Sequence, residues 1–148
     1  MFNKKDILIT GGTGSFGHSF VPLTLKKYNP KRLVILSRDE MKQWEMAKLF
    51  NNDPRVRFFI GDVRDKERLH RALYDIDFVV HAAALKQVPA AEYNPFEAVK
   101  TNILGTHDLA VISYKHNVEN FVLISSDKAV RPTNIMGATK RFAEIILQ

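Results

Sequence analysis

Short apolar runs alternate with longer amphipathic segments along this 148-residue chain. The short runs are rich in β-branched and aromatic residues, and they are long enough for buried strands but too short for helices. The predicted strands are Asp6–Thr10, Arg32–Ser37, Val56–Ile60, Phe78–His81 and Asn120–Ser125, and the predicted helices are Phe16–Lys27, Glu40–Leu49, Lys66–Tyr74, Pro95–Lys115 and Asn134–Gln148. This alternation predicts an α/β fold with a doubly wound parallel sheet, helices on both faces and the strand order 3-2-1-4-5.

Glycines follow the first predicted strand at once and lead into the first predicted helix. Gly11 allows a tight turn, Gly14 lets backbone N–H groups approach a pyrophosphate, and Gly17 lets the helix pack closely. The anion then lies at the positive end of the helix. A glycine triplet alone also fits an ordinary turn, but the order of strand, turn and helix favours dinucleotide binding. The candidate cofactor-binding residues in this turn are Gly11, Thr13, Gly14, Ser15, Phe16 and Gly17.

The end of the second predicted strand distinguishes NAD from NADP. NAD-binding sequences carry an acidic residue there, which accepts hydrogen bonds from the ribose hydroxyls. This chain has Ser37 and Arg38 instead, and a hydroxyl beside a guanidinium suits the 2′-phosphate of NADP. Lys42, one helical turn further, can join Arg38 on the phosphate. NAD remains the alternative because Asp39 can accept from a ribose hydroxyl, although Asp39 is also a good helix cap.

The carboxyl ends of the predicted strands should form one ligand crevice, because parallel strands end at the same edge of a sheet. After the third strand, the loop Gly61–Val63 brings Asp62 close to the adenine amino group, with Val63 beside it. After the fourth strand, within the predicted loop His81–Pro89, the small residues Ala82, Ala83 and Ala84 let the backbone run against the cofactor.

A cluster of chemically active side chains follows the fifth predicted strand. Ser125 and Ser126 precede Asp127 and Lys128. A serine here can hydrogen-bond a substrate hydroxyl, while the Asp–Lys pair supplies an acid and a base. Lys140, on the next predicted helix, can reach the nicotinamide ribose. The alternative for Asp127 and Lys128 is an ordinary salt bridge in a loop.

Composition narrows the remaining classes of protein. The chain fits one domain spanning residues 1–148, and its net charge of +6 comes from scattered basic residues rather than from the stripe of basic and aromatic residues that nucleic-acid binding favours. Histidines lack the spacing of a metal site, and His81 is expected to be structural. The absence of cysteine excludes disulfides, and the absence of a long apolar window predicts no membrane segment and a cytoplasmic location.

Several strings beyond the glycine turn are more specific. They are Ser37-Arg38-Asp39-Glu40-Met41-Lys42-Gln43, Gly61-Asp62-Val63-Arg64-Asp65, His81-Ala82-Ala83-Ala84-Leu85-Lys86-Gln87-Val88-Pro89, Thr101-Asn102-Ile103-Leu104-Gly105-Thr106 and Ser126-Asp127-Lys128-Ala129-Val130. With them, the chain resembles the extended short-chain dehydrogenases/reductases. Within that superfamily it is most similar to the UDP-N-acetylglucosamine 4,6-dehydratases of bacterial polysaccharide, capsule and flagellar-sugar biosynthesis.

The resemblance implies a lyase that converts UDP-N-acetylglucosamine to a 4-keto-6-deoxy sugar. NADP⁺ would take a hydride from the 4-position, elimination would follow, and NADPH would return the hydride to the 6-position. Lys128 is then the base at the 5-position, Asp127 the acid for the departing 6-hydroxyl, and Ser126 the partner of the 4-oxygen. A lysine serves as a base only if its pKa is brought toward neutrality. Lys86 would face the sugar nucleotide, with an ordinary solvated lysine as the alternative.

Two features depart from the family pattern. Superfamily members usually carry Tyr-x-x-x-Lys, but Met136 stands four residues before Lys140, and a thioether cannot transfer a proton. One branch of the dehydratases is similar in having methionine here, so the acid/base assignment for the oxidation step stays open. Family members also continue into a carboxyl-terminal domain that holds the UDP-sugar, which we expect to be absent from residues 1–148.

Other functions compatible with the resemblance are an NDP-sugar epimerase or reductase and a cofactor-binding module without activity. A homo-oligomer is also expected, because the two long helices Pro95–Lys115 and Asn134–Gln148 resemble those of a dimer-building four-helix bundle. Their apolar stripe comprises Phe96, Val99, Ile103, Ala110 and Tyr114. The alternative is that this stripe only covers its own sheet.

Overall fold

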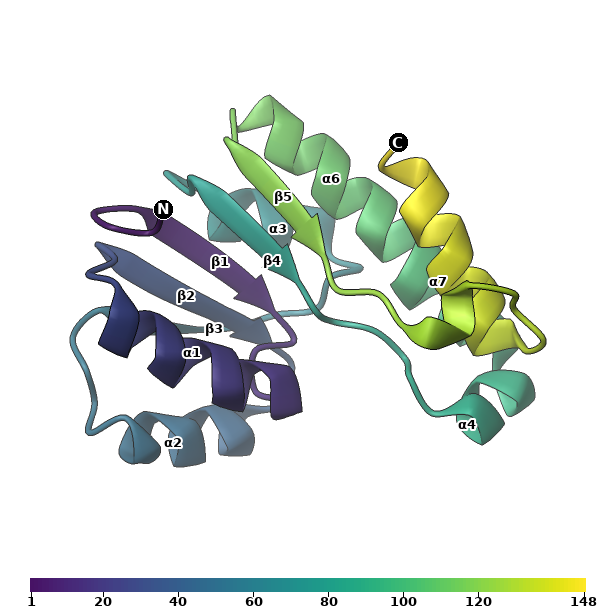
Figure 1. Cartoon of the computed structure of the whole chain (residues 1–148), viewed down its shortest axis with the longest axis horizontal. Coiled ribbons are helices and arrows are strands. Elements are labelled where there is room, and N and C mark those ends of the chain that lie inside the picture. The colour runs from purple at the N-terminus through teal and green to yellow at the C-terminus, as the bar shows by residue number, and fades with distance from the viewer.

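A computed structural model describes residues 1–148 and contains one five-stranded parallel sheet (Figure 1). The strand order is β3-β2-β1-β4-β5, which confirms the predicted fold class and topology. The strands are β1 (Asp6–Thr10), β2 (Arg32–Ser37), β3 (Val56–Ile60), β4 (Phe78–His81) and β5 (Asn120–Leu123). Thr10, at the end of β1, pairs with Leu36 on one side and with His81 on the other, so the carboxyl ends meet at one edge.

Helices cover both faces of the sheet (Figure 1). They are α1 (Ser15–Lys27), α2 (Glu40–Leu49), α3 (Lys66–Ala72), α4 (Val88–Tyr93), α5 (Pro95–Ala98), α6 (Gly105–Lys115) and α7 (Ile135–Ile146), with a π-helix η1 (Val99–Leu104) and a 3₁₀ turn η2 (Asp127–Ala129). None of them combines the length and the apolar character that a membrane crossing requires.

The core consists of two layers, one on each face of the sheet. Leu8 of β1 packs with Leu69 of α3 and Leu109 of α6. Its neighbour Ile9 points to the other face, into the cluster that contains Val21 of α1 and Met46 of α2. Successive residues of a strand alternate between faces, so both layers need apolar residues. The central strands β1, β2 and β4 are therefore nearly continuous hydrophobic runs, whereas the edge strands β3 and β5 carry exposed positions.

The structure differs from the prediction in one additional helix, one helix type and one strand end. The segment predicted as a loop after β4 contains α4, which has a proline in its first turn. The single helix predicted over Pro95–Lys115 is helical throughout but includes the π-helix η1. The fifth strand ends at Leu123 rather than at Ser125, because its last pairing partner in β4 is His81, the end of that strand.

The predicted helices Lys66–Tyr74 and Asn134–Gln148 are also shorter in the structure. The first ends at Ala72, after which Leu73 and Ile76 turn into the core. The second begins at Ile135 because Asn134 is its cap, with the side-chain oxygen accepting a hydrogen bond from the Gly137 N–H at 2.7 Å.

Candidate functional site

A cleft of about 1060 Å³ opens at the carboxyl ends of the strands. Almost all of the predicted cofactor-binding residues line it, together with Lys86, the predicted substrate-binding residue. Those lining residues are Gly11, Thr13, Gly14, Ser15, Phe16, Ser37, Arg38, Lys42, Asp62, Val63, Ala82, Ala83 and Ala84. Gly17 and Lys140 lie outside this lining.

The glycine turn forms one wall of the cleft, and two of its glycines are required by close packing. Gly11 has a φ of +66°, and a Cβ there would lie 2.7 Å from backbone atoms of Ala83. Gly17 is buried beneath the turn, where a Cβ would lie 1.7 Å from the carbonyl oxygen of Gly12. Glycine at position 11 therefore lets the turn pack against the loop after β4, and glycine at position 17 lets α1 pack against the turn.

The start of α1 is open to an anion. Gly14 is its cap residue and makes no side-chain capping bond, and the first turn of the helix holds no acidic residue. The first N–H groups of a helix have no partners within it and lie at its positive end. Ser15 and Phe16 bring this end into the lining of the cleft, so the turn fits a pyrophosphate.

Hydrogen-bond donors gather at the end of β2. The buried Ser37 hydroxyl accepts a bond from Gln43 Nε2 at 2.9 Å, which leaves its own proton free to donate. The Arg38 side chain is 63% exposed and is therefore available to a ligand. Asp39 caps α2 by accepting from the Lys42 N–H at 3.0 Å, the role that the sequence left as an alternative.

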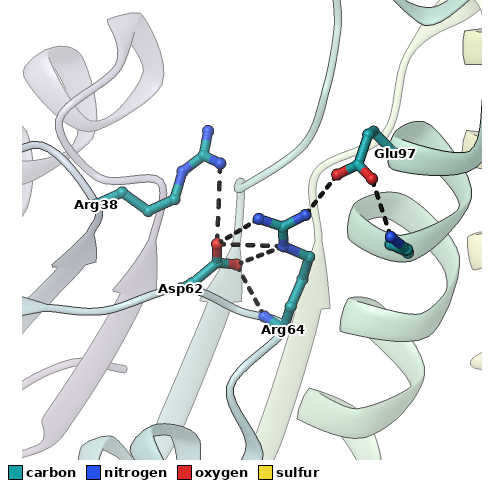
Figure 2. A network of polar contacts seen from close by, with 5 residues as sticks. Arg38, Asp62, Arg64 and Glu97 are labelled. Carbon is teal, nitrogen blue, oxygen red and sulfur yellow. Dashed lines mark hydrogen bonds and ion pairs between the residues drawn. The ribbon is translucent and has the colours of Figure 1, made fainter. Parts of the chain in front are cut away.

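A charged network joins this region to α5 (Figure 2). Arg64 donates from Nε and Nη2 to the Asp62 carboxylate at 3.0–3.2 Å, and from Nη1 to Glu97 Oε2 at 2.7 Å. Arg38 Nη1 lies 3.8 Å from Asp62 Oδ2, and Lys100 Nζ lies 3.0 Å from Glu97 Oε1. Burial raises the pKa of Asp62, but the bonds from Arg64 outweigh burial and bring the pKa below its usual value. Asp62 is therefore a carboxylate held by Arg64.

A chain of hydrogen bonds supports the floor of the cleft. Thr106 donates its hydroxyl proton to the Asn102 carbonyl at 2.7 Å, so it must accept from His81 Nε2 at 2.9 Å. His81 Nδ1 is then an acceptor for the Thr10 hydroxyl at 2.6 Å, and Thr10 in turn accepts from the Ala83 N–H. Burial, assisted by the nearby Lys140, lowers the pKa of His81 to about 3. The ring is neutral and fully bonded, as expected of a structural histidine.

Asn102, which the sequence suggested only as part of a motif string, holds three segments together. Its side-chain oxygen accepts a hydrogen bond from the Leu85 N–H at 2.8 Å. Its side-chain nitrogen donates to the Leu85 carbonyl and to the Thr139 hydroxyl, both at 3.0 Å. Asn102 lies in the π-helix η1, an element that often occurs at functional sites. It thus fixes the loop after β4 relative to α7, the helix that carries Lys140.

The predicted catalytic residues Ser126, Asp127 and Lys128 lie together in and before η2, outside the cleft lining. The Ser126 hydroxyl donates to Asp127 Oδ1 at 3.0 Å, and Lys128 Nζ lies 3.5 Å from the same oxygen. The Ser126 bond and then the Lys128 ammonium hold the pKa of Asp127 below its usual value. Asp127 is therefore a carboxylate here, and the predicted acid role requires these contacts to change when substrate binds.

Lys140 is anchored in the protein rather than exposed. Its ammonium donates to the Ile124 carbonyl at 2.6 Å, next to the end of β5. Burial lowers the pKa of Lys140, and the Glu144 carboxylate opposes this shift. Met136, in the place of the usual tyrosine, packs in a small apolar cluster with Ala91 and Ala98. No proton-transfer group occupies that position.

Residues that the sequence did not single out as ligands also line the cleft: Leu36, Met41, Trp44, Leu85 and Thr101. Trp44 is the only tryptophan in the chain, and its side chain is 56% exposed. The Lys48 ammonium lies 3.3 Å from the centre of its ring. A single aromatic residue on a helix gives no periodic signal, so only the structure connects Trp44 to the cleft.

Comparison with known proteins identifies the family of this chain. The family described as polysaccharide biosynthesis protein matches residues 7–148. UDP-N-acetylglucosamine 4,6-dehydratase (inverting) of Campylobacter jejuni is 56% identical over 140 residues, which cover 95% of this chain and 42% of that protein. The chain thus spans less than half of the length of this relative.

Solved structures show the same arrangement of elements. Pen from Bacillus thuringiensis is 41% identical, with a TM-score of 0.95 over 99% of this chain and 45% of its own. UDP-glucose 4-epimerase from Bifidobacterium longum, solved with NAD⁺ and UDP, is 27% identical, with a TM-score of 0.82 over 96% of this chain and 48% of its own.

Proposed function

The chain belongs to the polysaccharide biosynthesis protein family, and from that membership we propose that it forms the cofactor-binding and catalytic part of an NADP-dependent UDP-N-acetylglucosamine 4,6-dehydratase. The observation that carries the proposal is the cleft, because its glycine turn, uncapped helix start and Ser37–Arg38 pair are complementary to a phosphorylated dinucleotide. The identity of 56% to the Campylobacter jejuni dehydratase favours this chemistry. A cytoplasmic location is part of the same proposal.

The cofactor would be held by groups that follow the first three strands. The start of α1 receives the pyrophosphate, Arg38 and Lys42 bind the 2′-phosphate, and Asp62 accepts from the adenine amino group. When bound, the nicotinamide supplies a reversible acceptor for hydride. NADP is favoured over NAD because the end of β2 offers a hydroxyl and a guanidinium where NAD-binding proteins carry an acidic residue. Asp39, one residue further, caps α2 through Oδ1 and keeps its other oxygen for a ribose hydroxyl.

The catalytic roles belong to the side chains after β5. Lys128 would remove the proton at the 5-position of the sugar, and Ser126 would donate a hydrogen bond to the 4-oxygen. Asp127 would protonate the departing 6-hydroxyl once its bonds to Ser126 and Lys128 are released. Lys140, fixed by the Ile124 carbonyl, would orient the nicotinamide ribose, and Lys86 at the cleft rim would face the sugar nucleotide.

The test uses residues 1–148 alone and as a chimera that replaces the matching segment of the Campylobacter jejuni dehydratase. Alone, the chain should bind NADPH without converting UDP-N-acetylglucosamine, because it spans only 42% of the length of that dehydratase. We expect the remainder to be needed to position the sugar nucleotide, and positioning can supply roughly 7–11 kcal/mol of barrier lowering. The chimera should form a product lighter by one water, measured by mass spectrometry. A product from the chain alone would contradict the first expectation, and an inactive chimera that binds NADPH would favour a non-catalytic module.

A second candidate is an NDP-sugar epimerase, because the chain has the fold of the Bifidobacterium longum UDP-glucose 4-epimerase. The residues of this chain favour dehydration instead, since Met136 cannot transfer a proton and the pair Asp127–Lys128 follows β5. The same assay decides, because epimerisation leaves the mass of the sugar nucleotide unchanged.

We also propose self-association through the helical segment Pro95–Lys115 and the predicted helix Asn134–Gln148, which contains α7. Of the predicted stripe, Phe96 and Tyr114 are 70% and 85% exposed, and Phe142 and Ile145 of α7 are about half exposed. Apolar side chains exposed on adjacent helices are typical of interfaces. Light scattering should therefore give twice the monomer mass, and a monomer at high concentration would contradict the proposal.

A further inference from the structure

We infer that Arg64 is a positioning residue for cofactor selection: by neutralising Asp62 it leaves Arg38 free to bind the 2′-phosphate. The role rests on the proposed use of NADP. Arg64 itself does not line the cleft, whereas Asp62 and Arg38 both do. Its effect on the ligand would therefore pass through Asp62.

Arg64 makes more and shorter contacts with the Asp62 carboxylate than Arg38 does. Both Arg64 Nε and Nη2 donate to Asp62, and the Arg64 backbone N–H donates to Asp62 Oδ1 at 3.0 Å. Arg38 makes only a long ion pair of 3.8 Å with Asp62. Glu97 holds the far side of the Arg64 guanidinium at 2.7 Å, so the side chain is fixed between two carboxylates (Figure 2).

The charges of the network leave one cation in excess. Arg38, Arg64 and Lys100 supply positive charge, while Asp62 and Glu97 supply negative charge. Of the three cations, Arg38 is the one with the longest ion pair and the one that lines the cleft. The surplus charge is thus presented where the proposal requires a phosphate to bind.

Loss of Arg64 would change this balance. Asp62 would remain a carboxylate without its bidentate partner, and Arg38, already 3.8 Å away, would move onto it. A guanidinium bound to a carboxylate has fewer free donors for a phosphate, and without Arg64 less positive charge offsets the repulsion between Asp62 and the phosphate dianion. NADH lacks that phosphate, so its binding should be affected much less.

The experiment measures Kd for NADPH and NADH through quenching of Trp44 fluorescence, in wild type, Arg64→Gln and Arg71→Gln. Arg71 is the matched control, because it is an exposed arginine of α3 that makes no ion pair. Arg64→Gln should reduce the preference for NADPH by roughly five- to tenfold, and Arg71→Gln should leave it unchanged. Melting temperatures of all variants report whether each one folds.

The double variant Asp62→Asn, Arg64→Gln separates a charge effect from a structural one. It removes the carboxylate but keeps an oxygen that can accept from adenine, so the NADPH preference should return. An unchanged preference in Arg64→Gln, or a preference that stays lost in the double variant, would overturn the role of Arg64 and leave the proposed function standing. A wild-type preference for NADH would overturn the NADP assignment, and the role of Arg64 with it.

Discussion

An alanine at position 17 should abolish NADPH binding and destabilise the fold by about 3 kcal/mol or more. The new Cβ would lie 1.7 Å from the Gly12 carbonyl oxygen, and Gly12 is itself closely packed, since a Cβ there would lie 2.9 Å from the Ile35 side chain. Either the turn or α1 must move, and the pyrophosphate site depends on both. Thermal melting should show a fall of about 6–12 °C.

The control for Gly17→Ala is Ser19→Ala, a small change at an exposed position of the same helix. It should leave both the melting temperature and NADPH binding as in wild type. A Gly17→Ala protein with normal melting and normal NADPH affinity would show that the close approach of α1 to the turn is dispensable.

Replacing Lys128 in the chimera should lower kcat for dehydration by about 10²–10⁴, the usual contribution of a general base. Lys128→Met removes the amine, whereas Lys128→Arg keeps the positive charge but cannot give up a proton at neutral pH. Both variants should therefore lose activity if Lys128 is the base. Both should keep NADPH affinity, because Lys128 lies outside the cleft lining.

The matched control is Lys26→Met, an exposed lysine in the last turn of α1, which should keep full activity. A Lys128→Arg chimera with nearly normal kcat would mean that this position supplies charge and not a proton acceptor. The base would then have to be found elsewhere in the site.

The sheet could be predicted from the sequence because its central strands β2, β1 and β4 are buried on both faces. Short apolar runs such as Asp6–Thr10 and Arg32–Ser37 are typical of parallel strands covered on both faces. The cleft followed from the same inference, since parallel strands bring the glycine turn, Arg38, Asp62 and the alanines to one edge. Local sequence was sufficient for both conclusions.

The remaining features depend on contacts between distant residues. The end of β5 is fixed by the length of β4, its neighbour, and no local pattern around Ser125 could reveal it. The clamp of Asn102 on Leu85 and the bond between Arg64 and Glu97 join segments that are 17 and 33 residues apart. Single polar residues of this kind carry no periodic signal, so their partners are visible only once the chain is folded.

The most direct measurement of the central claim is a fluorescence titration of Trp44, the only tryptophan and a residue of the cleft wall. NADPH should quench it saturably and bind more tightly than NADH. Arg38→Asp should weaken the binding of NADPH far more than that of NADH, because it removes the side chain that binds the 2′-phosphate. Absence of saturable quenching, or equal losses for the two cofactors in Arg38→Asp, would contradict an NADP site in this cleft.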